Sequence, residues 1–211
     1  MTSVQQAAKL TARGAATKAR IVTAAADLML ERGAAGTTLD DVLAASGTSK
    51  SQLYHYFGNK DDLIRAVVRH QAQRIQQDQR PELDALGSLA GLARWRDKIV
   101  AAQAAHDQVG GCPLGSLANE LAGGDPQTRG VLQECFAEWE APLRAGLTAM
   151  RDRGSLSPEA DPAALAEAIM AALQGGLLLA KTHRSSRPLA RALDMAIAHV
   201  HSLATASQLG V

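Results

Sequence analysis

Hydrophobic positions in this chain recur every three or four residues within successive segments, which are separated by short stretches rich in Gly, Pro and polar residues. This spacing is typical of amphipathic α-helices, and the strict alternation typical of strands is hard to find. Ala and Leu dominate, whereas aromatic residues make up only 3% of the chain. The pattern therefore predicts an all-α fold.

The first periodic segment, KARIVTAAADLMLERG, starts at Thr17. Its apolar positions form one stripe, and Gly33 gives a helix-ending signal. We expect this helix to cover the inner faces of the segment that follows. The residues of the stripe are Ile21, Ala25, Leu28 and Met29.

Residues 37–60 read as two short helices joined by a tight turn. Thr38 is a good N-cap for the first, and Gly47 can take the left-handed conformation that ends it. Ser49 then caps the second, on which Leu53 and Phe57 form a buried stripe. Two helices across so short a turn make a helix-turn-helix.

The outer face of the second helix carries polar side chains and no acidic one. Gln52 can pair with an adenine edge and Lys50 can donate to guanine, while Tyr54, His55 and Lys60 suit phosphate oxygens. The alternative interpretation is an ordinary solvated helix face above two core aromatic residues. The helix cap, the turn, the aromatic residues and the basic residues all occur in one window, which favours a DNA-binding face. The candidate DNA-binding residues are Thr38, Ser49, Lys50, Ser51, Gln52, Tyr54, His55 and Lys60.

The segment TTLDDVLAASGTSKSQLYHYFGNKDDL resembles the signature of the TetR family of transcriptional regulators, over roughly residues 17 to 64. The resemblance implies a homodimer that binds operator DNA through an N-terminal three-helix helix-turn-helix domain. It also implies a C-terminal helical domain for ligand binding and dimerisation. Two positions depart from the pattern: Ser51 stands where Gly is frequent, and Asp40 where a basic residue is common.

Charge is distributed unevenly along the chain. The net charge is +1, but residues 1–60 hold seven Lys/Arg and four acidic residues, and the remainder is net negative. A basic head on a mildly acidic body fits a DNA-binding module with a separate second domain. We therefore divide the chain into a flexible basic arm (1–16), a helix-turn-helix domain (17–60), a connecting helix (61–80) and a ligand-binding and dimerisation domain (81–211).

Two of these segments carry open questions. The arm either follows DNA, along the phosphates or in the minor groove, or is a soluble tail. The connecting helix, capped by Asn59, has an apolar seam and is long enough to link the head to the body.

His70 lies on this apolar seam. We interpret it as a packed or surface imidazole and not as a sensor. Pro81 is expected to break the chain.

The body begins with a predicted helix over 82–108, a Gly-Pro corner, and a helix over 126–153 kinked at Pro142. The phrase GCPLGSLANEL is similar to a ligand-domain segment of a TetR subgroup that includes regulators of multidrug exporters. We expect the aromatic residues to form a cavity wall, with simple core filling as the alternative. The candidate pocket residues are Trp95, Cys112, Leu114, Leu117, Phe136, Trp139, Gln174 and Leu178.

The last two predicted helices cover 161–183 and 186–204. The first is apolar nearly all round, which is more than one domain face requires. Pairing both helices with their symmetry mates would give a four-helix dimer interface, in agreement with the family resemblance. The predicted interface residues are Leu165, Ile169, Leu173, Leu193, Ile197 and Val200.

These observations predict a ligand-responsive regulator, a repressor, that binds a palindromic operator as a homodimer and is released by a small apolar or aromatic effector. The alternative is a redox-responsive regulator on the same fold that uses Cys112 and Cys135. Catalytic and metal-site motifs are not found, so we expect no enzyme, cofactor or metal. No apolar run approaches the ~18 residues of a membrane span, and we expect a cytoplasmic protein.

Overall fold

The structure, a computed structural model, describes residues 10–105 and 111–205. Over these residues it is built from helices, and its only β-type pairing is one isolated bridge between Leu156 and Ala204. The predicted all-α class is confirmed. In chain order the helices are α1 (Ala12–Arg32), α2 (Leu39–Ser46), α3 (Lys50–Tyr56), α4 (Lys60–Leu83), α5 (Leu89–Ala105), α6 (Pro113–Leu121), α7 (Pro126–Asp152), α8 (Pro162–His183) and α9 (Arg187–Ser202).

The chain forms two compact units that divide between His70 and Gln71. We call them the head (described residues 10–70) and the body (71–105 and 111–205). The division falls within α4, so this helix contributes its first half to the head and its second half to the body. The predicted break at Pro81 is wrong: α4 runs on to Leu83, because a proline so near the end removes only one hydrogen bond of the last turns.

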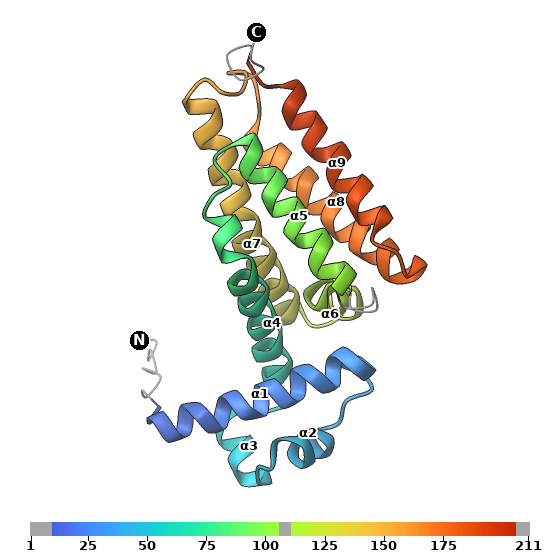
Figure 1. Cartoon of the computed structure of the whole chain (residues 1–211). Coiled ribbons are helices and arrows are strands. Elements are labelled where there is room, and N and C mark those ends of the chain that lie inside the picture. Colours follow the sequence, from blue (N-terminus) through green and yellow to red (C-terminus); the bar gives the residue numbers. More distant parts are fainter. Residues whose placement is uncertain (1–9, 106–110, 206–211) are drawn as a thin grey trace. The chain divides into compact units, whose positions relative to one another are not determined.

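In the head, α1 lies across α2 and α3 (Figure 1). Thr11 caps α1, its hydroxyl accepting from the Gly14 N–H, and Gly33 follows its last residue. Residues 12–16, predicted to belong to the flexible arm, therefore form helix; residues 1–9 of that arm lie outside the described residues. The core of the head includes Ile21, Ala25, Met29, Val42, Leu53, Phe57 and Leu63.

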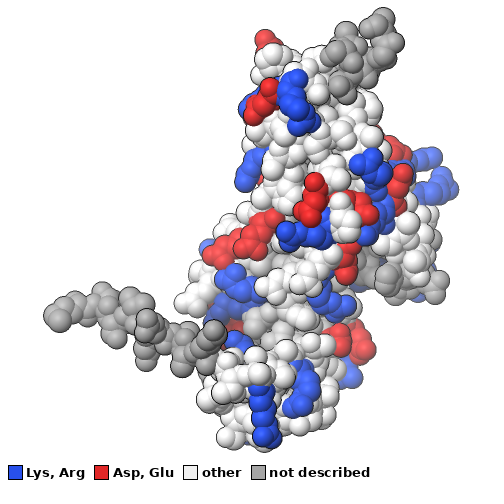
Figure 2. Space-filling model, turned by 60° about the vertical axis from the view of Figure 1, so that its left-hand side comes forward, with Lys and Arg blue, Asp and Glu red and all other residues white. Residues whose placement is uncertain are grey.

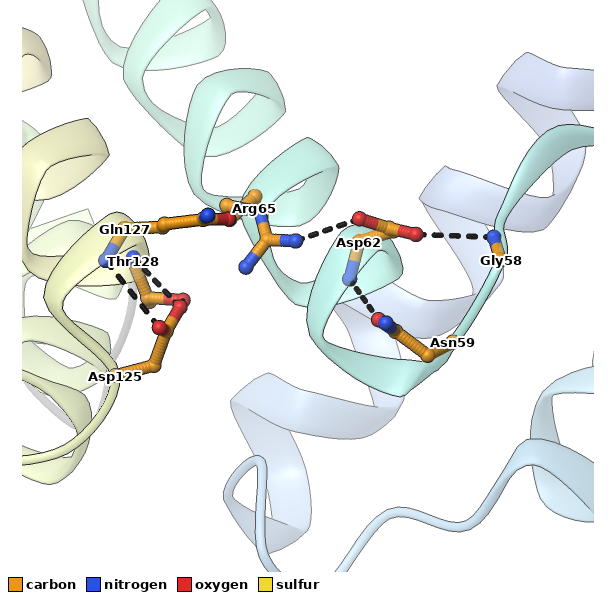
Figure 3. Close-up of polar contacts among 7 residues, drawn as sticks. All are labelled: Gly58, Asn59, Asp62, Arg65, Asp125, Gln127 and Thr128. Carbon is orange, nitrogen blue, oxygen red and sulfur yellow. Dashed lines mark hydrogen bonds and ion pairs between the residues drawn. The ribbon is translucent and has the colours of Figure 1, made fainter.

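Helix α4 begins as expected at Asn59. Its side-chain oxygen accepts from the Asp62 N–H at 2.8 Å, and the Asp62 carboxylate accepts from the Gly58 N–H at 3.0 Å (Figure 3). These bonds satisfy donors that the first turn of a helix leaves unpaired. Figure 3 also shows the equivalent device in the body, where the Asp125 carboxylate accepts from the backbone of Gln127 and Thr128 at the start of α7.

The body is a bundle of long helices in which α8 packs against both α7 and α9, and α5 packs against α9 (Figure 1). The predicted helix over 82–108 is two elements, since a turn at 84–88 separates α4 from α5. Ser88 makes this boundary: its Oγ accepts from the Gly91 N–H at 3.0 Å, as an N-cap does. Helix α7 is continuous through Pro142.

The predicted dimer residues are all buried inside the protomer. Their apolar stripes on α8 and α9 face neighbouring helices of the same chain, which leaves little of these side chains exposed on the protomer. A helix that is apolar nearly all round does not reveal in its sequence which stripe its own bundle covers, so an interface through these residues stays a prediction. Their exposures are Leu165 6%, Ile169 1%, Leu173 0%, Leu193 0%, Ile197 8% and Val200 0%.

One helix of the described residues, α8, is long and apolar enough to cross a membrane by length and composition alone. Glu167 and Gln174 interrupt its apolar sequence, so it is not an unbroken apolar run of the kind that the sequence analysis looked for. Its packing between α7 and α9 is that of a core helix. The length and apolar composition of α8 are therefore only weak evidence of a membrane span.

Candidate DNA-binding face and effector cavity

Helix α3 is fixed in place by bonds between near neighbours in the sequence. Gly47 adopts φ 62° and ψ 33°, the left-handed conformation, and so ends α2 tightly. The Ser49 hydroxyl then accepts from the Gln52 N–H at 3.2 Å, which caps α3. Leu53 and Phe57 point into the core with 0% and 3% exposure. The opposite side of α3 is left to solvent.

Most of the side chains predicted to bind DNA are exposed on the head. Within the head, Thr38, Ser49, Lys50, Ser51, Gln52, Tyr54 and His55 are all exposed, and Lys60 is half-buried. Tyr54 has 47% exposure although it is a large aromatic residue. In the part of the head that carries α2 and α3, the face shown in Figure 2 displays several basic side chains. This arrangement presents hydrogen-bond donors and positive charge together, as a phosphate backbone requires.

Two of the candidates are already engaged. The Gln52 Oε1 accepts from the Ser49 N–H at 2.9 Å, so only its amide nitrogen is available to a base edge in this state. The Thr38 hydroxyl donates to the Asp41 carboxylate at 2.6 Å and accepts from the Asp41 N–H at 3.1 Å. The two-point pairing of Gln52 with adenine thus requires its capping bond to open. The sequence contained this signal, because Ser-x-x-Gln is a capping-box pattern.

Two aromatic neighbours of this face also have defined roles. Tyr56 is half-buried and packs edge-on against His55 at 4.9 Å between ring centroids. Lys18 of α1 places its Nζ 5.7 Å from the centroid of the Phe57 ring. This cation–π contact ties α1 to the residue that ends α3, and the sequence analysis missed it because the partners are far apart in the chain.

The body contains a cavity of about 860 Å³ between α6, α7 and α8. Four of the predicted pocket residues line it: Cys112, Phe136, Gln174 and Leu178. The other four, Trp95, Leu114, Leu117 and Trp139, do not line this cavity and are buried in the body. The remaining lining residues, which the sequence analysis did not single out, are Gly111, Gly115, Ser116, Ala118, Asn119, Glu120, Gly175, Leu177, Lys181 and Thr182.

The tryptophans do not line this cavity, and their burial fits the alternative of simple core filling. Trp95 and Trp139 have 0% and 2% exposure, and both indole nitrogens donate to the Oε1 of Gln79, at 3.0 and 3.2 Å. A buried indole N–H needs an acceptor, and the one available lies on α4. Phe136, three residues before Trp139, is the aromatic residue that lines the cavity.

Gln174 is half-buried, whereas the other polar lining residues apart from Cys112 are exposed: Ser116, Asn119, Glu120, Lys181 and Thr182. Its Nε2 is buried and has no partner at hydrogen-bond geometry in the described part of the chain, although the side chain lies close enough to the Cys112 sulfur to lower the pKa of that thiol. Gly115 makes room for it, since a Cβ at that position would lie 2.6 Å from the Gln174 Oε1. An unpaired buried donor costs free energy, and a bound molecule with an acceptor would satisfy it.

The two cysteines are buried, with 8% exposure for Cys112 and 1% for Cys135. Burial raises the pKa of the Cys112 thiol. The Gly115 N–H, which donates to its sulfur at 3.2 Å, and the Gln174 side chain oppose this only in part. A raised pKa disfavours the reactive thiolate. The structure therefore gives no support to the redox alternative. Among the described residues, no three His, Cys, Asp or Glu side chains gather as metal ligands do.

Comparison with known proteins agrees with this geometry. Residues 21–67 match the family described as "Bacterial regulatory proteins, tetR family", and residues 88–196 match "Tetracyclin repressor-like, C-terminal domain". The chain belongs to the TetR family. It is thus a transcriptional regulator whose head is the DNA-binding domain. The finer subgroup suggested by GCPLGSLANEL remains a prediction.

Relatives cover most of this TetR-family chain. An uncharacterised HTH-type transcriptional regulator from Lactococcus lactis is 31% identical over 188 residues, which is 85% of this chain and 90% of the relative. The transcriptional regulator AcuR of Cereibacter sphaeroides is 32% identical over 80% of this chain and 78% of its own length. A TetR transcriptional regulator from Chloroflexus aurantiacus has a similar structure, with a TM-score of 0.78 and 26% identity over 92% of this chain and 98% of that one.

Proposed function

We propose that this protein is a ligand-responsive transcriptional repressor that acts in the cytoplasm, binds a palindromic operator as a homodimer and leaves it when a small molecule occupies the cavity of the body. The observation that carries the proposal is the exposed, acid-free outer face of α3. In a helix-turn-helix this is the helix that enters the major groove. A ligand would act by favouring a separation of the two heads that no longer fits the operator.

The residues of the face divide into two roles. Lys50 and the free amide nitrogen of Gln52 would contact base edges. Tyr54, His55 and Lys60 would contact phosphates, which position the protein and carry no sequence information.

The test uses duplexes selected by the parent protein from a random pool. Tyr54→Ala combined with Lys60→Ala should weaken binding to all duplexes and flatten its salt dependence, whereas Gln52→Ala should relax the base preference at one position. Fluorescence anisotropy across a salt series measures both effects. Arg80→Ala, which removes an exposed cation of the body, is the control. If the double variant binds DNA as tightly as the parent, the assignment of α3 as the helix that contacts DNA is wrong.

For the dimer, the exposed sides of α8 and α9 replace the buried residues of the sequence prediction. Leu179 and Met195 are 48% and 74% exposed, which is unusual for large apolar side chains. Exposed apolar side chains on adjacent helices are typical of self-association surfaces. Met195→Glu should yield monomers by light scattering and Met195→Leu should not; a dimeric Met195→Glu variant would place the interface elsewhere.

The effector would be an uncharged or weakly polar molecule that carries a hydrogen-bond acceptor. The ring of Phe136 and the side chains of Leu177 and Leu178 offer apolar surface, and the unpaired Nε2 of Gln174 offers one donor. A panel of neutral aromatic ketones and their hydrocarbon analogues, assayed for release of the selected duplex, tests this class. Gln174→Leu should abolish the preference for the ketones and leave DNA affinity unchanged. Release by charged compounds alone would contradict the proposed class.

A further inference from the structure

A single carbonyl oxygen on α4 accepts both tryptophan N–H groups of the chain. The Gln79 Oε1 lies 3.0 Å from the Trp95 Nε1 on α5 and 3.2 Å from the Trp139 Nε1 on α7. An amide oxygen has two lone pairs, so one side chain satisfies both donors. All three residues are buried. This cluster therefore joins three helices of the body at one point.

The ring of Phe136 lies between this cluster and the cavity. Phe136 lines the cavity, and its ring stacks on Trp139 with 6.4 Å between centroids and 17° between planes. A molecule that displaces Phe136 would therefore change the packing of Trp139. Because a buried indole N–H that loses its acceptor is costly, Gln79 and the helix that carries it would have to follow.

We propose that Gln79 is a positioning residue that sets the place of α4 in the body, and that cavity occupancy reaches α4 through Phe136 and Trp139. This inference rests on the proposed function, since α4 is the helix that begins in the DNA-binding head. The contacts form a contiguous path between packed side chains, which is the physical requirement for such coupling.

A double-mutant cycle tests the path: Phe136→Leu, Gln79→Leu and the two combined, each assayed by anisotropy on a duplex selected by the parent. Each single change should alter the dissociation constant by about threefold or more, and the combined variant should differ little from the larger single change. Effects that multiply would overturn the proposal. So would a Gln79→Leu variant that binds like the parent.

Two controls separate the path from general damage. Gln79→Glu keeps an acceptor for both indoles and should restore the parent affinity to within about twofold. Gln103→Leu removes another buried glutamine of the body, whose Nε2 has no partner in the described residues, and should leave affinity unchanged. Should Gln79→Leu fail to fold, Trp139→Phe keeps the ring and removes only the N–H. The effect of Phe136→Leu should then disappear in the Trp139→Phe background, and its persistence would overturn the proposal.

A second readout needs no DNA. Phe136→Leu should speed hydrogen exchange in peptides covering residues 71–83 of the parent, but should add nothing in the Gln79→Leu or Trp139→Phe background. If the parent protein selects no duplex, the proposed function is wrong, but the exchange experiment still tests the path from Phe136 to α4. Unchanged exchange in α4 on Phe136→Leu would end the path while leaving DNA binding intact.

Discussion

The head and the body of this protein are held together by different kinds of polar contact. In the head, the bonds that shape the DNA-binding face join residues three or four positions apart, such as Thr38 with Asp41 and Ser49 with Gln52. In the body, the Gln79 side chain accepts hydrogen bonds from partners 16 and 60 positions away. The Arg96 guanidinium donates two hydrogen bonds, of 2.9 and 3.0 Å, to the carboxylate of Asp194, which is 98 positions away.

This difference has a functional meaning. Local bonds give the head a rigid outer face whose geometry depends little on the rest of the chain. The long-range bonds of the body connect helices that the proposed ligand would shift relative to each other. Under the proposed function, DNA recognition would depend on local contacts in the head and the ligand response on long-range contacts in the body. Substitutions in the two units should then have separable effects.

The largest expected effect comes from the core of the head. Leu53→Ala should lower the free energy of unfolding of the head by about 3 kcal/mol, because it leaves a cavity under α3. Hydrogen exchange should then accelerate in head peptides and much less in body peptides, and DNA binding should weaken. Leu30→Ala, at a position 48% exposed, is the matched control. Equal acceleration of hydrogen exchange in the head and the body would show that the head does not depend mainly on its own local contacts.

A smaller effect is expected at the turn of the helix-turn-helix. Gly47→Ala should cost about 1–2 kcal/mol, because φ is 62° there and a Cβ would meet nothing within 4 Å, so that the cost is one of backbone conformation alone. Gly130→Ala in α7, where the space is also open, should instead stabilise the body by about 0.5–1 kcal/mol. Urea denaturation measures both. Effects of the same sign would contradict this account of the turn.

The capping bonds of α2 should make the head sensitive to acid. The Thr38 hydroxyl and backbone N–H hold the pKa of the Asp41 carboxyl below its usual value. A carboxyl whose pKa is lower in the folded state stabilises fully above its unfolded pKa, about 3.9, and loses this contribution as pH falls through the folded pKa. Asp41→Asn should therefore destabilise the head at pH 7 and differ little from the parent near pH 2. Asp40→Asn is the control, and a gap between parent and Asp41→Asn that persists in acid would count against the bond.

The smallest effect is expected from the cysteines of the body. Because Cys112 and Cys135 are buried and the pKa of the Cys112 thiol is raised, the native protein should react with dithionitrobenzoate at pH 8 far more slowly than the unfolded chain. Two thiols should appear on adding urea. A native thiol that reacts at the unfolded rate would revive the redox alternative, and Cys112→Ser would identify which cysteine is responsible.

Several features of the body could not be read from the sequence for a common reason. The period of three and four shows that Trp95, Trp139 and Leu173 lie on apolar faces, but not which neighbour covers each face. The tryptophans were therefore assigned to a cavity wall and Leu173 to a dimer interface, whereas all three are in the core. Gln79, in a polar stretch of α4, gave no signal in the sequence, because its two partners are brought to it only by the bundle.

The sequence by itself determined the helices of the head, their caps at Thr38, Ser49 and Asn59, the turn at Gly47, and the acid-free face of α3. These are contacts within one helical turn, which the chain makes wherever it folds. Tertiary structure alone decided which residues line the cavity, which apolar stripe of α8 remains exposed, and that one glutamine serves two tryptophans. Such features depend on how helices distant in the sequence pack together, because packing decides which of several equally apolar faces is buried.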